Sequence, residues 1–166
     1  MFRRLASTED ISEPGRTPIT LADLIATLSS GLFSGASLYI NLVEHPARMQ
    51  AGTRVALAEF APSYKRATVT QVSLAIAGFL SALVAWRSRP DARWLLGGGL
   101  LASVVPFTAL AILPTNKKLL DPGTANDPDL AEGLLTRWGR LHAVRSALSL
   151  ASLLTFLFLL GERRKG

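Results

Sequence analysis

Residues 67–86 read Ala67-Thr-Val-Thr-Gln-Val-Ser-Leu-Ala-Ile-Ala-Gly-Phe-Leu-Ser-Ala-Leu-Val-Ala-Trp86 and contain no charged side chain. Three further uncharged blocks occupy residues 24–43, 94–113 and 146–160. A helix needs about 20 mostly apolar residues to cross the hydrocarbon of a bilayer. A helix of a soluble bundle would instead carry a polar stripe for water, and the quoted block has only Thr, Ser and Gln to offer. The blocks therefore predict membrane-spanning helices.

The chain as a whole fits one membrane domain. It has 166 residues, of which 49% are hydrophobic and 18% charged, and this composition excludes a disordered chain. We predict an all-α fold, a four-transmembrane-helix bundle over residues 19–160. A polar N-terminal tail, 1–18, would precede the bundle and a basic tail, 161–166, would follow it. The expected spans are about 22–43, 67–86, 94–113 and 141–160.

The fourth helix is expected to begin outside the membrane. Asp127-Pro128-Asp129 is typical of a helix start, because Asp caps a helix well and Pro suits its first position. This predicts an extramembrane extension before the fourth span. The uncharged block from residue 146 reaches about 20 residues only if the span starts at Leu141, which places His142 and Arg145 inside the membrane.

Small residues recur every fourth position in three of the spans, a spacing that lets helix backbones approach closely in lipid. We expect these residues to form the helix contacts: Gly31 and Gly35; Ser73, Ala77, Ser81 and Ala85; Ala147, Ala151 and Thr155.

Charge and cysteine content exclude several functions. The net charge is +6, but the basic residues divide between the two membrane faces and form no patch, which argues against nucleic-acid binding. Tight basic clusters beside a span, in residues 87–93 and 163–165, favour both termini in the cytoplasm. The absence of Cys excludes disulfides, thiolate metal centres and a thiol nucleophile.

The unusual polar residues collect at the helix ends on the opposite face. Asn41, Glu44, His45 and Arg48 have the spacing of one helix face at the end of the first span. Pro46 predicts that the regular helix ends just after His45, because the residue before a proline avoids the helical region.

The start of the fourth span carries a second polar face. Trp138, His142 and Arg145 follow one another at helical spacing, directly after Arg137. An ionised Arg145 in the membrane costs a few kcal/mol unless it is paired or hydrated. We expect Glu44 to be its partner.

Two kinds of chemistry suit these residues, and a purely structural clamp between helices is the alternative to both. His45, His142 and Glu44 could bind a non-haem iron or copper ion, but adjacent helical residues such as Glu44 and His45 point about 100° apart. In metal-free chemistry a neutral histidine would accept a proton, while Arg145, Arg137 and Asn116 stabilise the anion that forms. Aromatic walls for a flat substrate would come from Trp138 and Tyr64.

Three runs resemble the anthrone-oxygenase-like family of small four-helix membrane proteins. They are Gly31-Leu-Phe-Ser-Gly-Ala-Ser-Leu-Tyr-Ile-Asn-Leu-Val-Glu-His-Pro-Ala-Arg48, Pro114-Thr-Asn-Lys-Lys-Leu119 and Arg137-Trp-Gly-Arg-Leu-His-Ala-Val-Arg145. The resemblance extends from Ile19 to Leu160. The Glu44-His45 pair resembles the bacterial branch, which implies a bacterial inner membrane.

Fungal members of that family oxidise polyketide anthrones to anthraquinones with molecular oxygen and are thought to need no flavin or haem. The resemblance implies that His142 is the base and that Asn116 and Arg145 hold the oxyanion. It also implies O2 as co-substrate, no further cofactor, and a hydrophobic aromatic molecule bound within the lipid bilayer. The expected catalytic set is His142, His45, Glu44, Arg145 and Asn116, and the expected substrate-binding set is Asn41, Tyr64, Trp138, Arg137 and Arg48.

A non-enzymatic membrane protein remains the alternative. It would bind a lipid or small molecule, or serve as a partner subunit, with its polar cluster only clamping the helices. The sequence is also compatible with a homo-oligomer.

Overall fold

The computed structural model describes residues 18–165, and these residues are helical over most of their length, with no strand among them. In chain order the elements are α1 (Leu21–Tyr39), the π-helical turn η1 (Ile40–Glu44), α2 (His45–Gln50), α3 (Thr53–Ser88), α4 (Ala92–Phe107), the π-helical turn η2 (Thr108–Ile112), α5 (Leu113–Leu119), the 3-10 turn η3 (Pro122–Asn126) and α6 (Pro128–Lys165).

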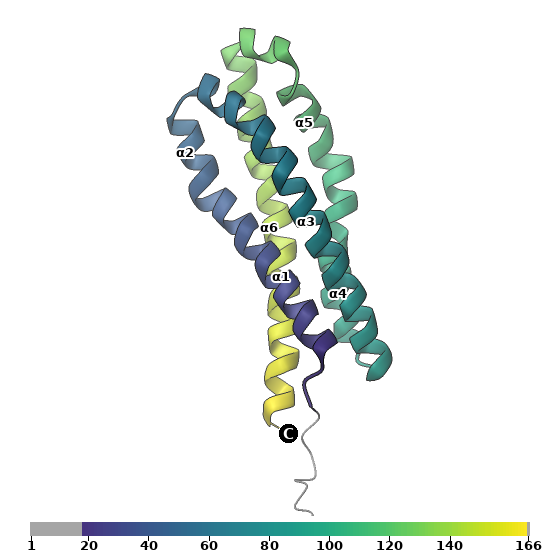
Figure 1. Cartoon of the computed structure of the whole chain (residues 1–166). Coiled ribbons are helices and arrows are strands. Elements are labelled where there is room, and N and C mark those ends of the chain that lie inside the picture. The colour runs from purple at the N-terminus through teal and green to yellow at the C-terminus, as the bar shows by residue number, and fades with distance from the viewer. Residues whose placement is uncertain (1–17, 166) are drawn as a thin grey trace, which may run out of the picture.

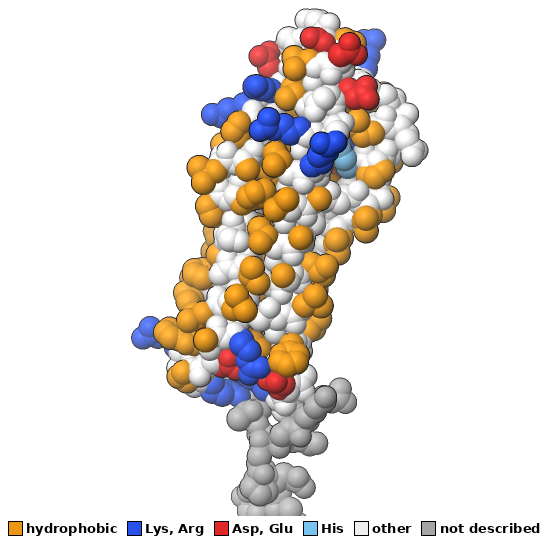
Figure 2. All heavy atoms as spheres, turned by 180° about the vertical axis from the view of Figure 1, so that it is seen from behind, with side chains coloured by type: hydrophobic (Ala, Val, Ile, Leu, Met, Phe, Trp, Pro, Cys, Tyr) orange, Lys and Arg blue, Asp and Glu red, His pale blue; other side chains and the backbone are white. Residues whose placement is uncertain are grey.

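These elements form four long helical units that lie side by side in an elongated bundle (Figure 1). Each unit is long and apolar enough to cross a membrane. Lys, Arg, Asp and Glu gather at the two ends of the face in Figure 2, and apolar side chains cover its middle. The predicted all-α fold with four apolar helices is therefore confirmed. Nearly all of the predicted tail 1–18 lies outside the described residues, whereas α6 continues to Lys165.

The helices start where the sequence provides caps. Thr20 and Asp23 form a reciprocal capping box at the start of α1, with Thr20 N donating to Asp23 Oδ2 at 2.8 Å. Asp127 Oδ1 accepts a 3.0 Å hydrogen bond from Leu130 N at the start of α6. The fourth helix thus begins at Pro128, well before the predicted span from Leu141, as its cap signal indicated.

Each helical unit packs against two others, α1 and α4 both lying against α3 and α6. Hydroxyl groups link them, because Ser30 Oγ lies 3.0 Å from Ser152 Oγ, which donates to the carbonyl of Gly97 at 2.7 Å. Such groups need internal partners where no water is available.

The predicted small-residue stripes were mostly wrong. Ser73, Ala147 and Ala151 are exposed, and a Cβ on Gly35 would meet nothing within 4 Å. In lipid, a large apolar residue is as well solvated on the outside of a helix bundle as inside it. The spacing of small residues therefore does not by itself determine which helix face makes the contacts. Over the same part of α3 the buried residues are Gln71, Ala75, Gly78, Ala82 and Ala85, so that only Ala85 is shared with the predicted stripe.

Two π-helical turns precede two prolines. The turn η1 ends two residues before Pro46, and η2 ends two residues before Pro114. A proline inside a helix removes one backbone hydrogen bond and crowds the carbonyl four residues back, which a wider turn accommodates. The regular helix is therefore interrupted before His45, and not after it as predicted from Pro46, and it resumes as α2.

At the end of the bundle near the chain termini, Asp23 and Arg163 form a buried ion pair between α1 and α6. The guanidinium carbon of Arg163 lies 5.0 Å from the ring centroid of Trp94 in α4. This pair ties three helices together at the end farthest from the polar residues described below.

The α4–α6 contact gives a test of the packing. A Cβ on Gly97 would lie 2.5 Å from Cε1 of the buried Phe156, whereas a Cβ on Gly99 would meet nothing within 4 Å. We expect Gly97→Ala to lower the unfolding free energy by about 1–3 kcal/mol, the usual cost of overpacking. Gly99→Ala should not lower it, because Ala favours a helix over Gly by about 0.5–1 kcal/mol. Thermal unfolding in detergent measures both. Equal melting temperatures for the two variants would contradict this packing.

Candidate functional site

A cavity of about 210 Å³ lies inside the half of the bundle that contains both π-helical turns. A single water needs only about 15 Å³ by the same kind of measure, so the space suits a larger molecule. Aromatic and aliphatic side chains form most of its wall. Its polar and charged lining consists of Glu44, Arg48, Ser63, Tyr64, Thr68, Gln71, Thr108, Asn116, Trp138, His142 and Arg145.

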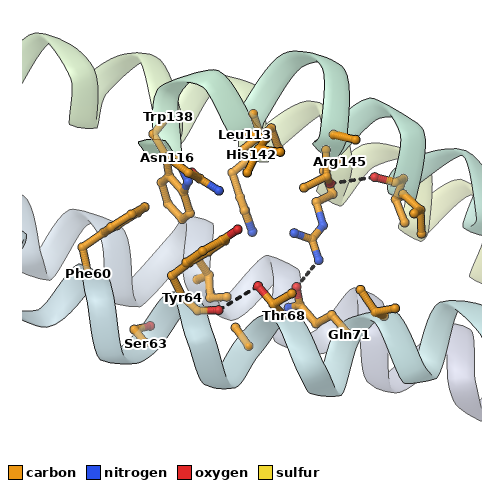
Figure 3. Close-up of a pocket in the computed structure, with 18 of the residues that line it drawn as sticks. Phe60, Ser63, Tyr64, Thr68, Gln71, Leu113, Asn116, Trp138, His142 and Arg145 are labelled. Atoms are coloured by element: carbon orange, nitrogen blue, oxygen red, sulfur yellow. Dashed lines mark hydrogen bonds between the residues drawn. The ribbon is translucent and has the colours of Figure 1, made fainter. Parts of the chain in front are cut away.

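His142 is held in a defined orientation. Its side chain points from α6 toward α3 (Figure 3) and the residue is 2% exposed. Nδ1 lies 2.7 Å from Oδ1 of Asn41, whose amide nitrogen donates to the carbonyl of Gly139 at 3.2 Å. Because that amide oxygen can only accept, Nδ1 carries the proton, and in the neutral ring Nε2 is left as an acceptor. The ring also stacks on Trp138, with 4.8 Å between centroids.

Arg145, one turn further along α6, holds its charge without a carboxylate. Its guanidinium donates to Oε1 of Gln71, and its Cζ lies 4.9 Å from the ring centroid of Phe33. Among the described residues it forms no ion pair. The prediction that Glu44 would be its partner was wrong. A half-buried cation held by a neutral amide leaves the cavity able to stabilise an anion.

Glu44 instead pairs with Arg48, and Ser63 donates to the same carboxylate at 3.1 Å. Arg48 Nε also lies 2.7 Å from Oε2 of Glu59, and its guanidinium carbon lies 5.6 Å from the ring centroid of Trp138. This cluster joins η1 and α2 to α3. It neutralises Glu44 and leaves Arg145 unpaired.

Asn116 lies in the cavity wall and carries an unpaired acceptor atom. It is 1% exposed and lies in α5, just beyond the second π-helical turn. Its Oδ1 has no hydrogen-bond partner within the part of the chain that is described. Buried polar atoms are nearly always satisfied, so an unpaired amide in a cavity wall is suited to a ligand.

His45 and Asn41 support the site from behind and do not line the cavity. His45 packs on α6, where a Cβ on Gly139 would come within 2.5 Å of its Nε2, and its ring centroid lies 5.2 Å from that of Trp138. The wider π turn directs Asn41 and His45 toward α6, and Glu44 toward α3, so the predicted single face divides between two helices.

The structure brings most of the predicted site residues together. Seven line the cavity, namely Glu44, Arg48, Tyr64, Asn116, Trp138, His142 and Arg145. Arg137 is not among them, because it is exposed in a separate shallow groove beside Asp129 and Arg140. Sequence reasoning missed Gln71 and Glu59, although Gln71 is the one amide in an otherwise weakly polar span.

The metal alternative does not fit this arrangement. No three His, Cys, Asp or Glu side chains within the described residues are placed to hold one ion. His142 lines the cavity, His45 packs behind it, and Glu44 is engaged with Arg48. These three side chains therefore do not form a metal site.

The fold and site define a class, a four-helix protein suited to a membrane with a histidine and an unpaired arginine in an aromatic-walled cavity. The family model described as "Anthrone oxygenase" matches residues 60–155, and the chain belongs to this family.

Curated relatives agree with this assignment. The chain is 31% identical to an anthrone oxygenase of Claviceps purpurea over 76% of this chain and 82% of the relative. It is 28% identical to the anthrone oxygenase tpcL of Aspergillus fumigatus over 80% and 89% of the two chains. For the anthrone oxygenase gedH of Aspergillus terreus the identity is 29%, over 70% and 84%. No solved structure matches the chain.

The Arg145–Gln71 contact can be tested through stability. Gln71→Leu would leave the buried guanidinium without its acceptor, and we expect a loss of about 1.5–3 kcal/mol, typical of a hydrogen bond to a charged group. Gln71→Glu keeps an acceptor and adds a counter-charge, so it should be at least as stable as the wild type. Melting temperatures in detergent would show the difference. A Gln71→Leu protein as stable as the wild type would contradict the contact.

Proposed function

We propose that the protein is an integral membrane oxidoreductase, a monooxygenase that oxidises a lipophilic aromatic substrate of the anthrone or hydroquinone type with O2. The observation that carries this proposal is the meeting, in one cavity, of an oriented His142 and the unpaired cation of Arg145. We propose O2 as the co-substrate and no other cofactor.

The reaction would begin with His142 as general base. Its Nδ1–H is committed to Asn41, so Nε2 is the atom that accepts a proton. An anthrone has an acidic CH2 group, and its deprotonation delocalises the electron pair onto the carbonyl oxygen. Arg145, and Asn116 through the N–H donors of its Nδ2, would stabilise that oxyanion. Trp138 and Tyr64 would hold the flat ring system.

The electron-rich carbanion then reacts with O2 to give a peroxide anion, which takes back the proton from His142. Loss of water from the resulting hydroperoxide forms the new carbonyl, so that CH2 and O2 give C=O and H2O. The cavity wall is largely apolar and would limit competition from bulk water. Each electron comes from the substrate, so the scheme needs no external reductant.

A purely structural clamp between helices explains the polar residues around the cavity less well. Glu44, Arg48 and Glu59 do join helices, as do Asn41 and His45. Arg145 and Asn116, however, line the cavity, and neither forms an ion pair among the described residues. Such intramembrane groups are best explained by a ligand.

We further propose the inner membrane of a bacterium as the location, with both termini in the cytoplasm. The basic residues at the C-terminal end, and those between α3 and α4, support this orientation. The cavity then lies in the half of the bilayer facing away from the cytoplasm.

Oxygen consumption in lipid nanodiscs tests the role of His142. With an anthrone or hydroquinone, His142→Ala should lower kcat by about 10²–10⁴-fold, the usual contribution of a general base. Arg140→Ala, an exposed change on the same helix, serves as the matched control and should retain wild-type turnover. A wild type that consumes no oxygen across such substrates would contradict the oxidoreductase proposal, and a fully active His142→Ala would contradict the base.

The charge of Arg145 gives a separate test, in which we expect activity to fall while stability is kept. Gln71→Glu should keep the protein folded but neutralise the guanidinium, so that kcat falls by about 10²–10³-fold, as when an oxyanion donor is lost. Oxygen uptake and product absorbance would measure this. Full activity in Gln71→Glu would mean that the substrate anion does not depend on Arg145.

A further inference from the structure

Four residues of the cavity wall are exposed. They are Thr68 and Val72 of α3, Val105 of α4 and Ala109 of η2. Val72 is 38% exposed and Val105 is 41% exposed. Residues that face both the cavity and the exterior mark an opening, and we call these four the lateral mouth.

The lateral mouth exists because α3 and the third helical unit separate along their length. They pack closely where Gly78 of α3 meets Leu101 of α4. Beyond that point α3 makes few contacts with η2 and α5. The π-helical turn coincides with this separation.

The lateral mouth lies within the uncharged stretches of the helices that border it. Val72 is six residues past the charged Arg66, or about 9 Å along the helix at 1.5 Å per residue. Ala109 is eight residues before Lys117, or about 12 Å by the same rise. No rim residue is charged, so the opening presents a route for an apolar molecule from the bilayer and offers nothing to an ion.

The end of the cavity nearest the aqueous face is closed. Phe60 packs edge-on to Trp138 at 5.5 Å and stacks on Tyr64 at 5.9 Å between centroids. The ion pairs of Arg48 with Glu44 and Glu59 lie across the same end. A molecule arriving from water would have to break both sets of contacts.

We propose that the substrate reaches His142 from the lipid phase, through the lateral mouth, and not from water. This route selects uncharged, flat, lipophilic molecules that partition into the bilayer and places their polar edge against His142, Arg145 and Asn116. That these molecules react once inside rests on the proposed function; the route itself does not.

Chemical labelling tests the route without using activity. The chain has no Cys, so Thr108→Cys introduces a single thiol inside the cavity. In nanodiscs, a pyrene maleimide that partitions into lipid should label this thiol readily, and a sulfonated, water-soluble maleimide should label it at least about tenfold more slowly, a rate ratio equal to a barrier difference of about 1.4 kcal/mol.

Blocking the lateral mouth should abolish the faster labelling by pyrene maleimide. On the Thr108→Cys background, Val72→Trp or Ala109→Trp should slow pyrene maleimide labelling by about tenfold or more. Leu157→Trp, on the exposed face of α6, is the matched control and should have no effect. Faster labelling by the sulfonated reagent, or labelling rates unchanged by both rim variants, would overturn the proposed route.

Measurements of turnover distinguish the proposed route from the proposed oxidation. If the route and the oxidation are both correct, Val72→Trp lowers kcat/KM for a membrane-dissolved anthrone while Leu157→Trp does not. Labelling that depends on the mouth in a protein that never consumes oxygen would support the route and overturn the oxidation. Normal kcat/KM in Val72→Trp and in Ala109→Trp would overturn the route for the substrate.

Discussion

The positive charge of Arg145 sits in an apolar bundle beside a neutral amide, and the arrangement of the whole site follows from that contact. A carboxylate beside Arg145 would have neutralised its charge, as Asp23 does for Arg163 at the other end of the bundle. Among the described residues, Glu44 is the one carboxylate that lines the cavity, and it is instead occupied by Arg48. Arg145 therefore lines the cavity with no carboxylate beside it, which favours an anion formed on a molecule bound next to its guanidinium.

The two π-helical turns place the groups that use this potential. The first directs Asn41 toward His142 and Glu44 away from Arg145, and the second precedes Asn116. Both turns accompany prolines that a regular helix would tolerate poorly. The second turn, η2, also lies where the third helical unit makes few contacts with α3, beside the lateral mouth. The two π-helical turns are thus connected both with the positions of the charged groups and with access to the cavity.

Much of the fold could be predicted from the sequence, because uncharged blocks of bilayer length and an Asp-Pro helix start are local signals. The site residues on α6 were also predictable, since intramembrane His and Arg are rare and costly. Their partners were not. Helical spacing placed Asn41, Glu44 and Arg48 on one face, but that argument assumes a regular helix, and the π turn changes the register. The contact faces were misjudged because lipid solvates large and small apolar residues alike.

The central claim is that the cavity stabilises an anion, and the ionisation of a bound lipophilic phenol tests it most directly. A chromogenic phenol titrated in nanodiscs reports its own ionisation by absorbance. We expect the phenol to ionise at lower pH when bound to the wild type than in protein-free nanodiscs, and we expect Gln71→Glu to remove the difference. A bound phenol that stays neutral to higher pH than in lipid alone would show that the cavity does not stabilise an anion.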